Sequence, residues 1–145
     1  MRFEQSVDIE AQQQRVWDVL TDLEAWPQRI ETVDALELLT PPPVALGSRV
    51  RLKQPKLGEG TWEVTLWDAP SYFEFRQQSG GVTSVAGHRV AALEEDRSRL
   101  TLTIEMRGLL VPVFGRLFKG LTTRYMTVEA QAMKRAAESE QPATT

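Results

Sequence analysis

The last third of the chain contains one long amphipathic segment, from about Pro112 to Ala136. Its apolar side chains recur at steps of three or four residues, which places them in a single stripe along a helix. The stripe consists of Phe114, Leu117, Phe118, Leu121, Tyr125, Val128, Ala132 and Ala136, and the opposite face carries Arg116, Lys119, Thr123, Thr127, Gln131 and Lys134. A helix of this kind must bury its stripe against another element. The rest of the chain therefore has to supply the apolar surface that the helix covers.

The sequence before this helix reads as a succession of strands. Apolar and polar residues alternate most clearly over 100–106, where Leu100, Leu102, Ile104 and Met106 share one face. The other predicted strands span 3–9, 30–39, 49–54, 61–67, 72–78 and 82–93, and two short helices, over 12–20 and from Asp22 to about Trp26, follow the first strand. Short connections favour antiparallel pairing. We predict an α+β fold in which a curved antiparallel sheet of about seven strands wraps around the C-terminal helix.

Length and composition limit the classes of function. The 145 residues suit one domain, which we place at 1–138, followed by a polar, disordered tail over 139–145. A net charge of −3 argues against a nucleic-acid partner. The chain has no cysteine and one histidine, which excludes thiolate nucleophiles and multi-histidine metal sites. We expect no cofactor, and because no stretch is apolar enough to span a membrane, we expect a cytoplasmic protein without stable membrane insertion.

The apolar faces of the strands and the helix stripe must meet, and a curved sheet leaves space between them for a ligand. We therefore expect a hydrophobic small molecule as the partner, whereas a protein partner cannot be named from the sequence. The expected lining residues are Trp62, Phe73, Phe75, Gln77, His88, Ile104, Met106, Phe114, Leu117, Phe118, Leu121 and Tyr125. The same residue types also build ordinary cores, so packing is the competing interpretation for each of them.

His88 is the best candidate for chemistry. Strand alternation places it on the inner face with Ala86 and Val90, where an imidazole could contact a ligand carbonyl or act as an acid or base near neutral pH. The competing interpretation is a buried histidine whose polar atoms are satisfied by a neighbour. A bulge at a nearby glycine would turn the side chain outward. Gln54, Gln77 and Tyr125 are further polar groups on inner faces. Each could equally lie at a strand end in water, as we expect for Gln54, and the Tyr125 hydroxyl is expected to point into the pocket or toward a strand.

Four segments carry a resemblance to a known family. They are Val16-Trp17-Asp18-Val19-Leu20-Thr21-Asp22-Leu23-Glu24-Ala25-Trp26-Pro27, Val64-Thr65-Leu66-Trp67-Asp68-Ala69-Pro70, Gly87-His88-Arg89-Val90, and Arg124-Tyr125. In this order and spacing the chain, from Phe3 to about Ala137, resembles the START-like (SRPBCC) superfamily with the helix-grip fold, in particular its polyketide cyclase/dehydrase-type branch. The resemblance implies a hydrophobic tunnel between helix and sheet. It implies no single activity, because the superfamily includes lipid carriers, hormone receptors and cyclases.

Three functional hypotheses follow. The first is binding of a lipid, isoprenoid or polyketide-like molecule in the cavity. The second is a polyketide cyclase or dehydratase that uses the same cavity, with His88 as the first candidate for proton transfer and Tyr125 as a helper. The third is a coenzyme-Q-binding or protein-partner module, which an exposed apolar patch over 109–113 would favour.

Overall fold

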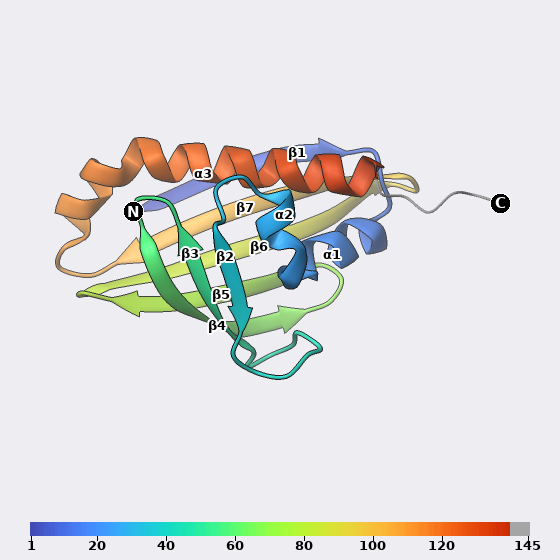
Figure 1. Ribbon diagram of the computed structural model, residues 1–145. Coiled ribbons are helices and arrows are strands. Elements are labelled where there is room, and N and C mark those ends of the chain that lie inside the picture. Colours follow the sequence, from blue (N-terminus) through green and yellow to red (C-terminus); the bar gives the residue numbers. More distant parts are fainter. Residues whose placement is uncertain (140–145) are drawn as a thin grey trace.

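A computed structural model describes residues 1–139 of the chain, and its strands form one sheet in the order β1-β7-β6-β5-β4-β3-β2 (Figure 1). The strands are β1 (Arg2–Ile9), β2 (Ala35–Leu38), β3 (Arg49–Gln54), β4 (Gly58–Asp68), β5 (Tyr72–Ser79), β6 (Val82–Glu94) and β7 (Arg97–Arg107). Each neighbouring pair is antiparallel. The predicted α+β helix-grip fold is confirmed.

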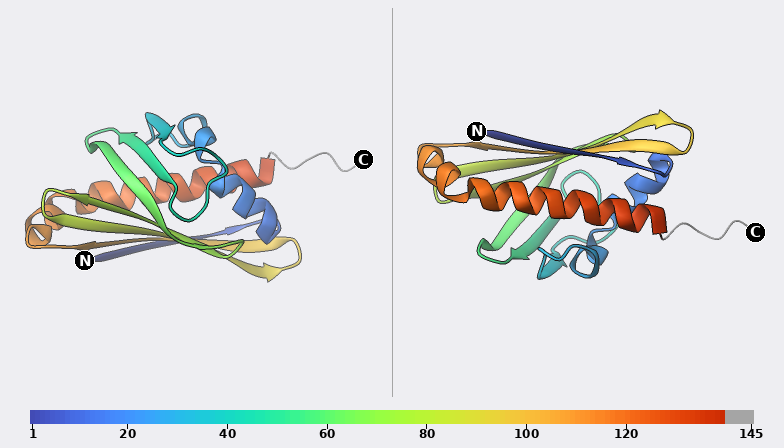
Figure 2. Two further views of the ribbon diagram at one scale, coloured as in Figure 1. Left: turned by 90° about the horizontal axis from the view of Figure 1, so that it is seen from below. Right: turned by 90° about the horizontal axis from the view of Figure 1, so that it is seen from above.

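The long helix α3 (Val111–Ser139) crosses the sheet diagonally, as Figure 2 shows. The shorter helical elements α1 (Gln13–Thr21), η1 (Leu23–Ala25) and α2 (Trp26–Arg29) follow β1. Arg15 of α1 donates hydrogen bonds to the backbone carbonyls of Ala136 and Ala137, near the C-terminal end of α3. Ser139 still belongs to α3, and the rest of the predicted tail, 140–145, lies outside the described residues.

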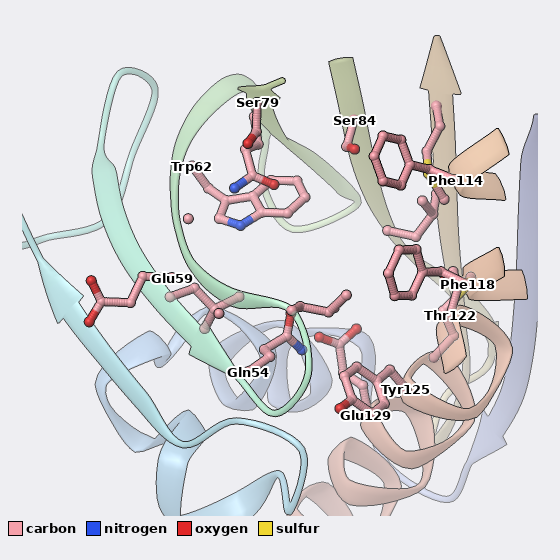
Figure 3. A pocket seen from close by; sticks show the side chains of 18 residues that line it. Gln54, Glu59, Trp62, Ser79, Ser84, Phe114, Phe118, Thr122, Tyr125 and Glu129 are labelled. Atoms are coloured by element: carbon pink, nitrogen blue, oxygen red, sulfur yellow. The ribbon is translucent and has the colours of Figure 1, made fainter. Parts of the chain in front are cut away.

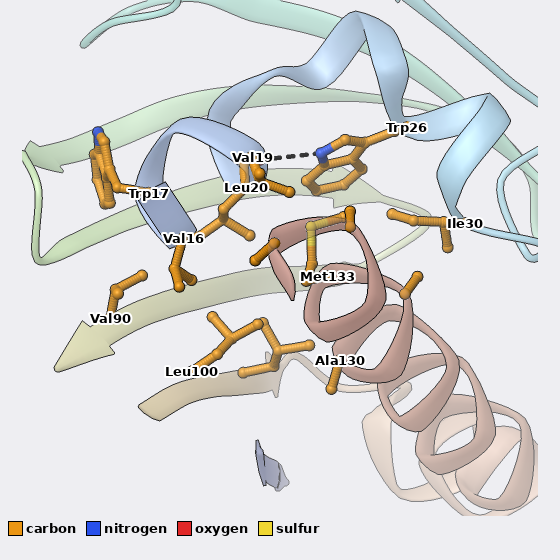
Figure 4. Packing of buried hydrophobic residues seen from close by; sticks show 14 of the residues in the cluster. Val16, Trp17, Val19, Leu20, Trp26, Ile30, Val90, Leu100, Ala130 and Met133 are labelled. Carbon is orange, nitrogen blue, oxygen red and sulfur yellow. Dashed lines mark hydrogen bonds between the residues drawn. The ribbon is translucent and has the colours of Figure 1, made fainter. Parts of the chain in front are cut away.

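The core lies between the C-terminal half of α3, the helices after β1 and the sheet (Figure 4). Met133 of α3, Leu20 of α1 and Leu100 of β7 are fully buried there. Burial of each such side chain stabilises the fold by roughly 1.5–3 kcal/mol. The buried Trp26 indole donates a hydrogen bond of 3.0 Å to the Leu20 carbonyl, which joins α2 to α1. This half of the helix is packed solidly, so space for a ligand lies toward the other end.

The region between α1 and β3 differs from its prediction. The short helix predicted from Asp22 to about Trp26 continues past Pro27, because this proline lies in the first turn of α2, where its missing N–H would be unpaired in any case. The strand predicted over 30–39 shrinks to β2, and Ile30 and Val33 lie before it in a turn closed by a hydrogen bond from the Val33 N–H to the Ile30 carbonyl. Both side chains are buried. Their apolar character reflects contact with the core rather than strand pairing.

A bulge changes which side chains of β4 face the core. Pairing with β5 shifts between Val64 and Leu66, so that the alternation of faces restarts after Val64. Leu66, which strict alternation over 61–67 would place on the inner face with Trp62 and Val64, is exposed instead. Trp67 turns inward and packs edge-on against Trp17 at 5.1 Å between ring centroids. The sequence alternation was therefore correct for the first half of β4 and wrong for the second.

The inward face of α3 also differs from the predicted stripe. In its C-terminal half the buried residues include Met126, Ala130, Met133 and Ala137, alongside the predicted Ala132 and Ala136. The helix is thus turned by roughly one residue, or about 100°, relative to the prediction. Leu117, from the predicted stripe, is 71% exposed. This rotation decides which polar side chain of α3 reaches the interior.

Candidate functional site

An open cavity of about 270 Å³ lies between the N-terminal half of α3 and the sheet (Figure 3). Helix α3 forms one wall, and strands β3 to β7 form the other. The lining residues are Leu52, Gln54, Leu57, Gly58, Glu59, Gly60, Trp62, Gln77, Ser79, Ser84, Ile104, Met106, Phe114, Phe118, Thr122, Tyr125, Met126 and Glu129. We call this space the outer cavity.

A smaller cavity of about 70 Å³, which we call the inner cavity, lies deeper beneath the sheet. It shares Leu52, Gln54, Trp62, Ile104, Met126 and Glu129 with the outer cavity, so the two adjoin along these side chains. Trp26, Phe75 and His88 are found only in the inner one. A ligand that enters from outside would therefore meet the apolar outer walls first and His88 last.

The residues predicted from the sequence fall into three groups. Trp62, Gln77, Ile104, Met106, Phe114, Phe118 and Tyr125 line the outer cavity, and Phe75 and His88 line the inner one. Phe73, Leu117 and Leu121 line neither cavity. Phe73 is fully buried beneath the His88 ring, and the rotation of α3 carries Leu117 to the surface and Leu121 off the cavity wall. Contact of any of these residues with a ligand stays a prediction.

His88 lies on the inner face of β6, as the alternation predicted, and is only 3% exposed. It is directly opposite Phe73 of β5, and the two rings stack with centroids 4.3 Å apart and planes 2° from parallel. Burial lowers the pKa of His88 to about 4, while backbone groups of Phe73 and Ala86 act weakly in the other direction. Nδ1 has no hydrogen-bond partner of normal geometry among the described residues. The imidazole is therefore neutral at physiological pH.

Glu129 of α3 is the site residue that the sequence analysis missed. Its Oε2 lies 3.8 Å from His88 Nε2. The Glu129 side chain is 20% exposed, because it lines both cavities. Burial raises the pKa of Glu129 to about 7. Since desolvation opposes charge on both groups, both are neutral between about pH 4 and about pH 7. The carboxyl group is poised to gain or lose a proton near neutrality.

One pattern in the sequence could have pointed to Glu129. Met126, Ala130, Met133 and Ala137 recur at helical spacing, and Glu129 lies on the edge of that row. The aromatic row through Phe114 and Phe118, which is continuous with Tyr125, is the more prominent pattern in the sequence. Both rows are apolar, so the choice between them depends on how the helix is set against the sheet.

Two polar residues of the outer cavity lie close to the backbone of the β3–β4 hairpin. The Tyr125 hydroxyl donates a hydrogen bond to the Pro55 carbonyl, in the turn between β3 and β4, and so ties α3 to that turn. The side chain of Gln77 lies against Gly60 of β4, where a Cβ would come within 1.7 Å of the Gln77 amide nitrogen. The glycine thus leaves the space that the Gln77 amide occupies. The Tyr125 hydroxyl therefore contacts the backbone of the turn between β3 and β4 and does not point into the cavity.

An apolar surface patch, which we call the lip, stands beside the outer cavity. It comprises Leu109, Leu110, Val113, Phe114 and Leu117, with Leu109 95% exposed and Val113 64% exposed. Phe114 belongs both to the lip and to the cavity wall. Val111 alone in this run is buried. Most of the segment 109–113 is therefore exposed, and such an exposed apolar patch favours the third hypothesis, a protein-partner module.

Within residues 1–139, no group of three or more histidine, cysteine, aspartate or glutamate side chains could hold a metal ion. In the same range, no helix is long and apolar enough to cross a membrane.

Comparison with known proteins finds one matching family model and several solved structures with the same fold. The model of a family described as polyketide cyclase/dehydrase and lipid transport matches residues 1–138. No curated protein matches the chain. A START superfamily protein from Mycobacterium smegmatis superimposes with a TM-score of 0.80 at 18% identity, covering 97% of this chain and 99% of its own.

Two enzymes are similarly close in structure. Norcoclaurine synthase from Thalictrum flavum, solved with dopamine and hydroxybenzaldehyde, gives a TM-score of 0.79 at 16% identity, covering 99% of this chain and 89% of its own. The Zhui aromatase/cyclase from a Streptomyces species gives 0.77 at 18% identity, covering 99% of each chain. At these identities the likeness shows the shared fold and leaves the activity open.

Proposed function

Because the chain belongs to the polyketide cyclase/dehydrase and lipid transport family, we propose that it binds a hydrophobic small molecule in the outer and inner cavities. The observation that carries this proposal is the outer cavity itself, whose exposed wall surface is mainly apolar, with side chains such as Trp62, Ile104 and Phe118. Apolar walls with a few polar groups are typical of ligand sites.

The volume narrows the class of ligand. A cavity of about 150 Å³ lined by apolar side chains can hold benzene, and the outer cavity measures about 270 Å³. A compact ligand of one or two rings fits this space, whereas a long acyl chain would remain largely outside. The norcoclaurine synthase structure, with dopamine and hydroxybenzaldehyde bound, is an example of ligands of this size in the same fold. Of the classes considered, a polyketide-like ring compound agrees best with the volume.

Apolar contact alone would give weak binding. An aromatic ring buries about 150–200 Å² of surface, worth roughly 4–5 kcal/mol at about 25 cal/mol per Å². This corresponds to a dissociation constant near the millimolar range. Tighter binding therefore requires a polar contact inside the cavity.

Native mass spectrometry after gentle purification, followed by displacement of an apolar fluorescent dye, tests the proposal. The variant Ser84→Trp fills the outer cavity, and Thr83→Trp places the same side chain on the opposite face of β6 as a matched control. We expect Ser84→Trp to abolish dye binding and Thr83→Trp to preserve it. A folded wild-type protein that carries no ligand and binds no dye would refute the proposal.

An enzymatic role is the second candidate, and the His88–Glu129 pair favours it. Two neutral acid–base groups 3.8 Å apart at the end of an apolar cavity could move a proton during a cyclisation or dehydration. A fold neighbour, the Zhui protein, is an aromatase/cyclase. On any substrate that is turned over, His88→Ala should lower the rate, and unchanged turnover would remove His88 from this role.

The exposed lip favours a third candidate, docking of a protein partner. From Val111 to Val128 the charged residues of α3 are Arg116, Lys119 and Arg124, all basic, so the partner surface would combine apolar and acidic side chains. A photo-crosslinking residue at Leu109 should give one discrete adduct that Val113→Asp abolishes. Crosslinking that is indifferent to Val113→Asp would count against docking.

We also propose a cytoplasmic location, which fractionation of the native cells would test.

A further inference from the structure

The junction between the two cavities holds a polar pair whose geometry is incomplete. Glu129 Oε2 and His88 Nε2 are 3.8 Å apart, which exceeds the length of a hydrogen bond. Within the described part of the chain, the Glu129 carboxyl makes no hydrogen bond, and Gln54 is a further polar residue that lines both cavities. An oxygen atom placed about 2.8 Å from Glu129 Oε2 and from His88 Nε2 would complete both hydrogen bonds. The pair is therefore shaped to receive one further polar atom.

We propose that Glu129 and His88 together bind a hydroxyl group of the ligand, so that the site selects compact ring-containing alcohols or phenols. This inference rests on the proposed binding function and names the chemistry that the inner end of the site recognises.

The donor and acceptor properties of the pair favour a hydroxyl over other groups. A neutral imidazole offers one N–H donor and one lone pair, and a protonated carboxyl group both donates and accepts. A ligand hydroxyl can donate to one member and accept from the other. A ketone or ether oxygen can only accept, and an ammonium group can only donate. A ketone can accept from both members only when the imidazole proton is on Nε2, and an ammonium group can donate to both only when it is on Nδ1, whereas a hydroxyl pairs with both members in either tautomer.

The sizes of the two cavities orient the ligand. The inner cavity, at about 70 Å³, has room for roughly two water-sized groups but not for a ring. The outer cavity, at about 270 Å³, has room for the ring itself. A ring compound would therefore sit in the outer cavity with its hydroxyl directed inward, between Glu129 and His88. The apolar walls then supply the surface that the ring buries, and Glu129 and His88 supply the selectivity for a hydroxyl group.

Three probes that differ in one group test the inference: 4-propylphenol, 4-propylanisole and propylbenzene. Isothermal titration or quenching of tryptophan fluorescence measures the affinity of each. For the wild-type protein we expect 4-propylphenol to bind at least about tenfold more tightly than either analogue, because two hydrogen bonds to buried polar groups are worth at least about 1.4 kcal/mol. Equal affinity for the three would overturn the inference and leave the proposed function intact. Failure of all three to bind would count against the proposed function itself.

Variants locate the source of any preference. Glu129→Leu should remove the preference for the phenol without weakening the binding of propylbenzene, and Glu129→Gln, which retains a donor and an acceptor, should keep part of it. Gln78→Leu makes a matched polar-to-apolar change on the exposed face of β5, outside both cavities, and should leave the preference unchanged. If Glu129→Leu kept the preference for the phenol, the hydroxyl would lie elsewhere and the inference would be wrong. Should Glu129→Leu fail to fold, His88→Phe, which preserves a ring stacked on Phe73, provides the same test.

Discussion

Replacing Glu129 with glutamine should make the protein more stable at high pH than at low pH, relative to wild type. In the unfolded chain the carboxyl group ionises near its ordinary pKa of 4.5, whereas burial raises its pKa to about 7 in the folded protein. Between these values the folded state binds more protons than the unfolded state, so this group lowers stability as pH rises. The loss is complete above about pH 7. Glutamine cannot ionise and does not incur it.

The shift of about 2.5 pKa units, from 4.5 to about 7, corresponds to at most about 3 kcal/mol. One fifth of the Glu129 side chain is exposed, so solvent screening makes this an upper limit. His88 acts in the opposite sense, because its pKa is lowered from 6.5 to about 4 and its contribution to stability rises with pH across that window. The two effects nearly cancel in the wild-type protein between about pH 4.5 and about pH 6.5. The variant Glu129→Gln removes the effect of Glu129, so the rise in stability with pH that His88 causes is no longer offset.

Urea denaturation followed by tryptophan fluorescence, at intervals from about pH 4.5 to about pH 8, measures the free energy of unfolding of both proteins. We expect the difference, Glu129→Gln minus wild type, to increase by up to about 3 kcal/mol by about pH 7 and then to remain level. Glu59→Gln makes the same chemical change on an exposed residue of the cavity rim and should follow the wild-type profile. A difference that stays constant over the whole range would refute the argument that burial keeps Glu129 neutral.

Three other changes probe the packing around the cavity. Tyr125→Phe removes the hydrogen bond to the Pro55 carbonyl and should lower the free energy of unfolding by about 0.5–1.5 kcal/mol in urea denaturation; no change would mean that the contact contributes nothing. Gly60→Ala should displace the Gln77 amide, which a shift of its NMR side-chain signals would reveal, and an unmoved signal would contradict the contact. Met133→Ala truncates a fully buried side chain and should lower the free energy of unfolding by about 2–5 kcal/mol, whereas a loss below about 1 kcal/mol would show that the core collapses into the space.

Much of the fold could be predicted because it rests on local patterns. The alternation over 100–106 predicts a strand whatever its neighbours are, and β7 contains that segment. The same reasoning correctly turned His88 inward, because β6 keeps its alternation without a bulge from Ala86 to Val90. The long helix was equally evident from its spacing. These are properties of a segment and its two faces, and they need no knowledge of what the segment packs against.

The tertiary structure decided the matters that depend on register and rotation. A bulge exchanged Leu66 for Trp67 at the core, and nothing in the alternation of β4 marks it. Helix α3 carries two adjacent apolar rows, and only its contact with the sheet and α1 selects the row that includes Met126 and Met133. That choice carries Glu129 to His88, a pair that the sequence keeps apart on different elements. The sequence by itself thus determined which segments form strands and helix and that they enclose apolar space. The packing of one against another determined the chemistry inside that space, because a turn of a helix by one residue exchanges the side chains it buries.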